Sequence, residues 1–103
     1  MASFFTTAFY HFVTINDIKN IQNIIQDYCD KTSIKGTILI ANEGINGTIS
    51  GKEIEILAFH EFIKHGPIFF TLFQPLEYKS SWSNKNPFYR MKVRLKKEIV
   101  ALG

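Results

Sequence analysis

The amino-terminal part of the chain alternates apolar and polar positions and then changes to a helical spacing. From Ser3 to Val13 the alternation is rich in Phe, Thr and Tyr, which is typical of a β-strand. Thr14 and Asp17 have the spacing of a helix-capping box, and the apolar positions after them recur every three or four residues. These positions are Ile18, Ile21, Ile24, Ile25 and Tyr28. The pattern predicts a first helix that begins after Thr14 and ends near Lys31.

The middle of the chain predicts a hairpin followed by a second helix. The β-branched run from Lys35 to Ala41 suits a buried strand, Asn46-Gly47 is a favoured hairpin turn, and Thr48 to Ser50 forms a second short strand. Ser50 and Glu53 make another capping box. The apolar face of the helix that follows consists of Ile54, Leu57, Ala58 and Phe62. This helix is expected to end at His65-Gly66-Pro67, because glycine and proline stop helices.

A final alternating stretch from Arg90 to Ile99 predicts the last strand. The order of elements is therefore β-α-β-β-α-β. This order packs as a four-stranded antiparallel sheet with both helices on one face, the α+β ferredoxin-like arrangement. Residues 68–89 form a long, aromatic connection that leaves room for a further short strand. With 103 residues, 46% of them hydrophobic, the chain has the size of one compact domain.

Positive charge is concentrated near the carboxyl end. Seven of the twelve basic residues lie between Tyr78 and Lys97, so residues 78–97 carry +7 and the rest of the chain carries −4. Four of them, which we call the basic stripe, occupy every second position: Arg90, Lys92, Arg94 and Lys96. Because successive side chains of a strand point to opposite faces, the apolar residues between them are expected to face the core. A row of like charges does not stabilise a strand, so the stripe predicts a docking surface for a polyanion, best matched by nucleic acid.

Further cations, a glycine-rich loop and three aromatic residues extend the predicted surface. The additional candidate RNA contacts are Lys79, Lys85 and Lys97. The candidate loop residues are Asn42, Glu43, Gly44, Asn46 and Gly47. Their types suit backbone amides that point at an anion, but a tight hairpin needs the same types, and composition favours the plain hairpin. The aromatic residues suit either base stacking or a flap over the core, and they are Trp82, Phe88 and Tyr89.

Other kinds of site find little support in the sequence. Cys29 is a lone thiol, more often a buried small hydrophobe than a nucleophile, and the scattered His11, His60 and His65 do not form a zinc set. We therefore predict no catalytic residue, no metal site and no cofactor in this chain. No apolar run reaches the roughly 20 residues that cross a bilayer, and the first ten residues lack the basic region of a signal peptide. A cytoplasmic location is predicted.

Three segments carry a family resemblance. They are residues 41–51 (ANEGINGTISG), the Trp82-Ser-x-x-x-Pro87-Phe stretch and residues 91–100 (MKVRLKKEIV). They resemble the amino-terminal domain of the rhodanese-like, oxygen-dependent tRNA uridine hydroxylases, and the resemblance covers all 103 residues. It implies an acylphosphatase-like domain over residues 1–103, with a rhodanese domain expected downstream. The resemblance implies that the catalytic cysteine lies in that rhodanese domain. Cys29 does not match the motif of that cysteine, so the catalytic role is not assigned to it.

The resemblance implies that the full protein is an oxidoreductase that hydroxylates the wobble uridine of certain tRNAs with molecular oxygen. This domain would then bind or position tRNA through the basic stripe, Lys97 and the loop from Asn42 to Gly47. The alternative is a structural module whose basic strand docks on its own rhodanese domain without contacting RNA. A free-standing acylphosphatase-like hydrolase is disfavoured, because Thr14-Ile15-Asn16 stands where those enzymes carry a glycine-rich arginine loop.

Overall fold

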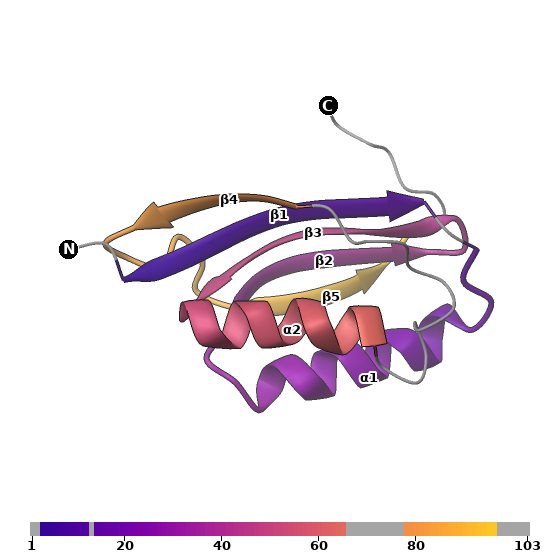
Figure 1. Cartoon of the computed structure of the whole chain (residues 1–103). Helices are drawn as coiled ribbons and strands as arrows, with labels where there is room; N and C mark the ends of the chain where they lie inside the picture. Colours follow the sequence, from indigo (N-terminus) through magenta and orange to yellow (C-terminus); the bar gives the residue numbers. More distant parts are fainter. Residues whose placement is uncertain (1–2, 13, 66–77, 97–103) are drawn as a thin grey trace.

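A computed structural model describes residues 3–12, 14–65 and 78–96 of the chain. These residues form a five-stranded sheet with two helices on one of its faces (Figure 1). The elements in chain order are β1 Phe4–Phe12, α1 Ile18–Asp30, β2 Lys35–Ala41, β3 Gly44–Gly51, α2 Glu53–His65, β4 Tyr78–Ser83 and β5 Met91–Leu95. The strands are ordered β4-β1-β3-β2-β5 across the sheet. We call the sheet face away from the helices the open face.

The sheet differs from the predicted one in strand number and direction. Four antiparallel strands were expected, whereas the sheet has five, and β5 pairs in parallel with β2. The strand that completes the antiparallel set by pairing with β1 is β4, inside the stretch 68–89 that was predicted as a connection with room for a short strand. The predicted last strand, 90–99, is shorter and becomes an added edge strand; its residues 97–99 lie outside the described part. The placement of both helices on one face is confirmed.

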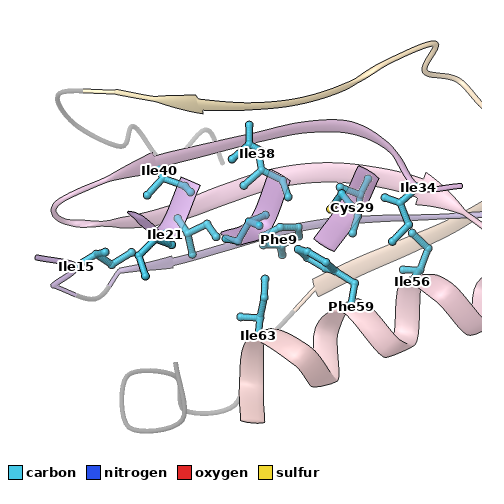
Figure 2. Close-up of a cluster of buried hydrophobic side chains, with 14 of the residues drawn as sticks. Phe9, Ile15, Ile21, Cys29, Ile34, Ile38, Ile40, Ile56, Phe59 and Ile63 are labelled. Carbon is cyan, nitrogen blue, oxygen red and sulfur yellow. The ribbon is translucent and has the colours of Figure 1, made fainter. Parts of the chain in front are cut away.

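The core fills the layer between the helices and the sheet (Figure 2). Alternate residues of β2 point into it, and Ile38 and Ile40 have no exposed surface. The two helices contribute three buried apolar residues each: Ile21, Ile25 and Cys29 from α1, and Ile56, Phe59 and Ile63 from α2. A fully buried isoleucine stabilises a fold by about 1.5–3 kcal/mol relative to an exposed one. This layer therefore supplies the main driving force for folding.

The starts of both helices were wrongly predicted. The N-cap of α1 is Asp17, whose carboxylate accepts the backbone N–H of Asn20 at 3.3 Å, so Thr14 does not cap this helix. Ser50 belongs to β3, and its hydroxyl oxygen accepts a hydrogen bond from Thr6 at 2.8 Å. The carbonyl of Lys52 instead accepts the first helical bond of α2, from the N–H of Ile56. Each cap lies two or three residues later than the box motif indicated.

The buried face of α2 was also wrongly predicted. Ile54 is 77% exposed and Leu57 is 39% exposed, whereas Ile56, Phe59 and Ile63 are fully buried. Apolar residues occur on both sides of this helix, so their spacing fits either face. Packing against the sheet, rather than the spacing, decides which side is buried. One apolar side of α2 is consequently left at the surface.

The hairpin turn lies earlier than predicted. Ala41 pairs with Gly44, so the turn residues are Asn42 and Glu43, and Asn46-Gly47 lies within β3. Gly47 does not have a positive φ angle; a Cβ there would lie 2.7 Å from the carbonyl oxygen of Thr37 on the neighbouring strand. Glycine at this position therefore permits close strand approach rather than a turn. The β2 strand itself requires glycine at Gly36, with a φ of 146°.

Candidate nucleic-acid interface

The basic stripe lies along β5 at one edge of the sheet. Arg90, Lys92, Arg94 and Lys96 are all exposed, whereas Val93 between them is only 5% exposed and packs in the core. The apolar flanks are less complete, because Met91 is half-buried and Leu95 is 37% exposed. At the centre of β5, where Val93 is buried and Lys92 and Arg94 are exposed, the predicted separation of a cationic side from a core side is confirmed. The four cations form no ion pair with any residue that the structure describes.

Pairing with β2 sets the direction of the stripe. Lys92 lies beside Thr37 and Arg94 beside Leu39, both on the open face, since Ile38 next to them faces the core. The parallel ladder extends to both ends of the stripe: Gly36 donates its N–H to the carbonyl of Arg90, and Lys96 donates its N–H to the carbonyl of Ile40, each at 2.8 Å. The backbone of the whole stripe is thus fixed to a buried central strand.

A further lysine joins the stripe through this pairing. Lys35 precedes Gly36, which pairs with Met91, so the register places Lys35 beside Arg90 on the open face. The alternation of Lys35 with Thr37 and Leu39 could have indicated its face, but only the long-range strand pairing brings it to the stripe. No Asp or Glu occupies an open-face position on any of the described strands. This edge of the open face therefore presents positive charge without a compensating acid.

Two glutamines of α1 cover the outer edge of β5. The Gln22 amide donates to the carbonyl of Val93 at 2.7 Å, and the side-chain oxygen of Gln26 accepts the N–H of Val93 at 3.2 Å. The amide of Gln26 also donates to the carbonyl of Met91 at 3.4 Å and to Asp30 at 2.8 Å. An edge strand otherwise leaves such backbone groups unpaired. These contacts hold the stripe in place from the side opposite β2, and no local sequence pattern predicts them.

The other predicted contacts are not gathered with the stripe. Lys79 lies on the open face but in β4, at the far edge of the sheet, about 19 Å from β5 at the usual strand spacing. Lys85 is exposed in the connection between β4 and β5, and Lys97 lies outside the described residues. Trp82 packs on Phe5, with 4.9 Å between ring centres, on the helix side of the sheet. These positions show that the predicted site divides between two edges.

Tyr89 is the aromatic residue best placed beside the stripe. It precedes Arg90 and is 94% exposed, whereas Phe88 is half-buried. The two predicted roles, covering the core and stacking on a base, therefore apply to different rings. Trp82 is partly packed against the domain, and Tyr89 is presented to solvent. An exposed ring next to cations is the arrangement used for stacking on bases.

The glycine-rich loop serves mainly to connect elements. Asn42 donates its side-chain amide to the carbonyl of Ile15 at 2.9 Å, and its own carbonyl accepts the N–H of Ile15 at 2.7 Å. This pair of bonds fixes the segment between β1 and α1. Glu43 is exposed at the turn, whereas Asn46 is half-buried on the open face of β3. The five candidate loop residues therefore do not point toward one shared anion position.

Two titratable groups of the core have shifted pKa values. Burial raises the pKa of the Cys29 thiol to about 12, and the charge of Asp30 acts in the same direction. Burial lowers the pKa of His60 to about 4, against a smaller opposite effect of Glu61. The Nε2 atom of His60 lies 2.8 Å from the hydroxyl of Thr7, and its ring stacks on Tyr78. The raised pKa keeps the Cys29 thiol protonated at pH 7, which is typical of a buried structural cysteine, and burial favours the neutral form of His60.

In residues 3–12, 14–65 and 78–96, no three His, Cys, Asp or Glu side chains come close enough together to hold a metal ion. Neither α1 nor α2 has the length and apolarity that a membrane-crossing helix requires.

Solved structures with the same fold come from proteins of different sequence. The dark-state structure of BlrB, a BLUF protein, superposes with a TM-score of 0.70 over 92% of this chain and 74% of its own, at 15% identity. Full-length HypF, in its phosphate- and nucleotide-bound form, matches with a TM-score of 0.53 and 18% identity, over 92% of this chain and 12% of its own. At these identities the likeness establishes the fold alone.

Curated relatives are much closer in sequence. A tRNA uridine(34) hydroxylase of Rhizobium leguminosarum is 46% identical over 97% of this chain and 31% of its own length. The proteins of that name from Acaryochloris marina and Neorickettsia sennetsu are 45% and 42% identical over the whole chain. The chain spans about a third of the length of these relatives. The model of the UPF0176 acylphosphatase-like domain matches residues 4–99, and the chain therefore belongs to this domain family.

Proposed function

We propose that this domain is the amino-terminal third of a tRNA uridine(34) hydroxylase and that its basic stripe contacts tRNA phosphates. The relatives that carry this name match nearly all of the chain, which supports the assignment. Hydroxylation would then take place in the remainder of such a protein, in a rhodanese domain that supplies the catalytic cysteine. The domain itself contributes binding or positioning of the tRNA. A tRNA-modifying role would place the protein in the cytoplasm.

The observation that carries the tRNA contact is the exposed stripe, which forms no ion pair within residues 3–12, 14–65 and 78–96. Lys92 and Arg94 project from one face of β5, about 7 Å apart along the strand, and Lys35 adds a cation at the end nearest Arg90. The backbone ladder to β2 and the glutamines of α1 fix these side chains on a rigid support. Exposed cations that no acid of the described strands accompanies are available to replace the counterions of a phosphate backbone.

A salt series tests the proposed contact. Replacing Lys92 and Arg94 with Ala removes two cations without touching the core, so the free energy of unfolding should change by less than about 0.5 kcal/mol per site. The slope of log affinity against log salt for tRNA should flatten by roughly 0.7–0.9 per lost phosphate contact. Binding is measured with the domain within the full-length hydroxylase and with the 103-residue chain alone.

A matched control removes the same charge from the helix side. Lys19 in α1 and Lys52 before α2 are also exposed, so the Lys19→Ala, Lys52→Ala variant should keep the wild-type salt slope. An equal slope in both double variants would contradict the tRNA contact. Limited proteolysis tests the alternative. If the Lys92, Arg94 variant is cleaved between this domain and the rest of the protein more readily than the wild type, the stripe docks on that remainder instead. The greater length of the relatives makes this second role the alternative.

A further inference from the structure

The outer edge of β4 differs from that of β5 in having no covering contact from the residues that the structure describes. β4 pairs with β1 on one side, and no described strand or helix pairs with its other side. Its residues 78–82 are all exposed, and Ser83 is half-buried. Six residues of extended backbone with a free edge are a template for another strand.

Apolar surface lies along the helix side of this edge. Tyr78 is 39% exposed and stacks on His60 of α2, with 4.3 Å between ring centres. Trp82, 49% exposed, lies at the other end of β4 against Phe5. On the helical wheel Leu57 follows the same flank of α2 as His60, and it remains 39% exposed. The helix side of this edge thus presents two aromatic rings, with the partly exposed Leu57 on the neighbouring flank of α2.

We propose that β4 pairs antiparallel with β4 of a second copy of this chain, about a two-fold axis at Ser80. A two-fold axis perpendicular to the sheet keeps the helices of both copies on the same side. Two residues that oppose each other across the joined β4 strands must therefore lie on the same sheet face. In the register centred on Ser80, Tyr78 faces Trp82 of the other copy, twice by symmetry, and Lys79 faces Ser81. The two five-stranded sheets then join into one sheet of ten strands.

The residue types that this register brings together favour this occupant. Aromatic cross-strand pairs are among the stabilising ones, and no like charges are directly opposed. The two Lys79 side chains are diagonal neighbours about 7–8 Å apart, a distance at which physiological salt screens much of their repulsion. The register centred on Ser81 would instead set Trp82 against Ser80 and lose both aromatic pairs. The proposal is independent of tRNA binding, because it uses the sheet edge opposite the basic stripe.

Sedimentation equilibrium of the 103-residue chain tests the dimer. Loading concentrations from about 10 µM to about 1 mM are needed, because an interface below standard size binds weakly. The wild-type mass should rise with concentration from 11.9 kDa toward twice that value. Ser80→Lys places two ammonium groups opposite each other at the axis and should raise the dissociation constant at least about fivefold. Asn23→Lys adds the same charge on the exposed side of α1 and should leave it unchanged.

Disulfide trapping tests the register separately. Directly opposed strand residues have the Cα separation that a disulfide needs, and the buried Cys29, with its raised pKa, does not compete for oxidised glutathione. Ser80→Cys should therefore form a covalent dimer at least about tenfold faster than Ser81→Cys, whose thiols are diagonal. A wild-type chain that stays monomeric throughout, a dimer that tolerates Ser80→Lys, or faster trapping of Ser81→Cys would each overturn the proposal.

Discussion

The two edges of the sheet manage their unpaired backbone in different ways. At β5 the helix α1 reaches past β2, and its Gln22 and Gln26 side chains bond the outer backbone groups of Val93 and Met91. At β4 the contact from α2 is a ring stack, in which His60 lies against Tyr78. The edge that displays charge is held from both sides, whereas no strand or helix of the described residues pairs with the outer side of β4. A fixed edge suits recognition of a rigid polyanion, and a free edge suits strand pairing.

The largest loss of stability is expected where β5 joins the sheet. Gly36 has a φ of 146°, and a Cβ there would lie 2.1 Å from the backbone oxygen of Thr48. Gly36→Ala should therefore lower the free energy of unfolding by roughly 3 kcal/mol or more, through strain and overpacking together. Gly51→Ala is the matched control, because its Cβ would meet its nearest neighbour at 3.4 Å. Equal urea midpoints for the two variants would contradict the β2–β3 geometry.

The next effect concerns the β4 side and depends on pH. His60 stays neutral in the folded protein down to about pH 4, whereas its pKa is 6.5 in the unfolded chain. Between these values the unfolded state binds more protons, so stability falls as pH falls and is fully present above pH 6.5. A loss of about 2 kcal/mol is expected between about pH 7 and about pH 5 from this group.

Urea unfolding of wild type and His60→Gln separates this effect from other titrations. The free energy of unfolding of the variant should be lower at every pH, because it loses the ring stack on Tyr78 and the ring contacts to Phe9 and Phe59. The diagnostic is its dependence on pH, which should be smaller than that of the wild type. If the two proteins lose the same stability between these pH values, His60 is not the group responsible.

A smaller effect is expected from the side chains that cover β5. Gln26→Ala removes the acceptor for the N–H of Val93 and should cost about 1–2 kcal/mol, because an edge group loses its partner. Amide hydrogen exchange gives the sharper readout, since the Val93 amide should lose protection first. Asn23→Ala changes an exposed position of the same helix and should alter neither quantity. Unchanged protection of Val93 would show that α1 does not guard this edge.

Features that depend on the local alternation of apolar and polar residues could be predicted from the sequence. Features that depend on strand pairing across the sheet could not. The alternation around Val93 was enough to assign its buried side and the exposed side of Lys92 and Arg94, and these assignments are confirmed. β4 escaped detection because its residues are exposed on both faces and show no apolar alternation. The parallel partner of β5, and with it the place of Lys35, follows from contacts more than fifty residues apart in sequence.

Local motifs failed where two solutions fitted the same residues. The Asn46-Gly47 pair is typical of a turn, but Gly47 lies within β3 and allows β2 and β3 to approach closely. On α2, Ile54 and Leu57 compete with Ile56 and Phe59 for the core, and the spacing of either set is helical. Packing against a sheet whose extent was unknown decided between them. The candidate site could therefore be located to one strand but not assembled from its neighbours.

The smallest effect on stability is expected at the aromatic residue next to the stripe. Tyr89 is 94% exposed, so Tyr89→Ala should change the free energy of unfolding by less than about 0.5 kcal/mol. Its loss should weaken tRNA binding by about 1–3 kcal/mol if the ring stacks on a base, with the salt slope unchanged because no phosphate contact is removed. Trp82→Ala at the other edge should do the opposite, lowering stability through the lost contact with Phe5 and sparing tRNA affinity. Binding measured at two salt concentrations, beside urea unfolding of both variants, distinguishes the two rings. Equal tRNA affinity for Tyr89→Ala and wild type would leave the stripe as a purely ionic contact surface.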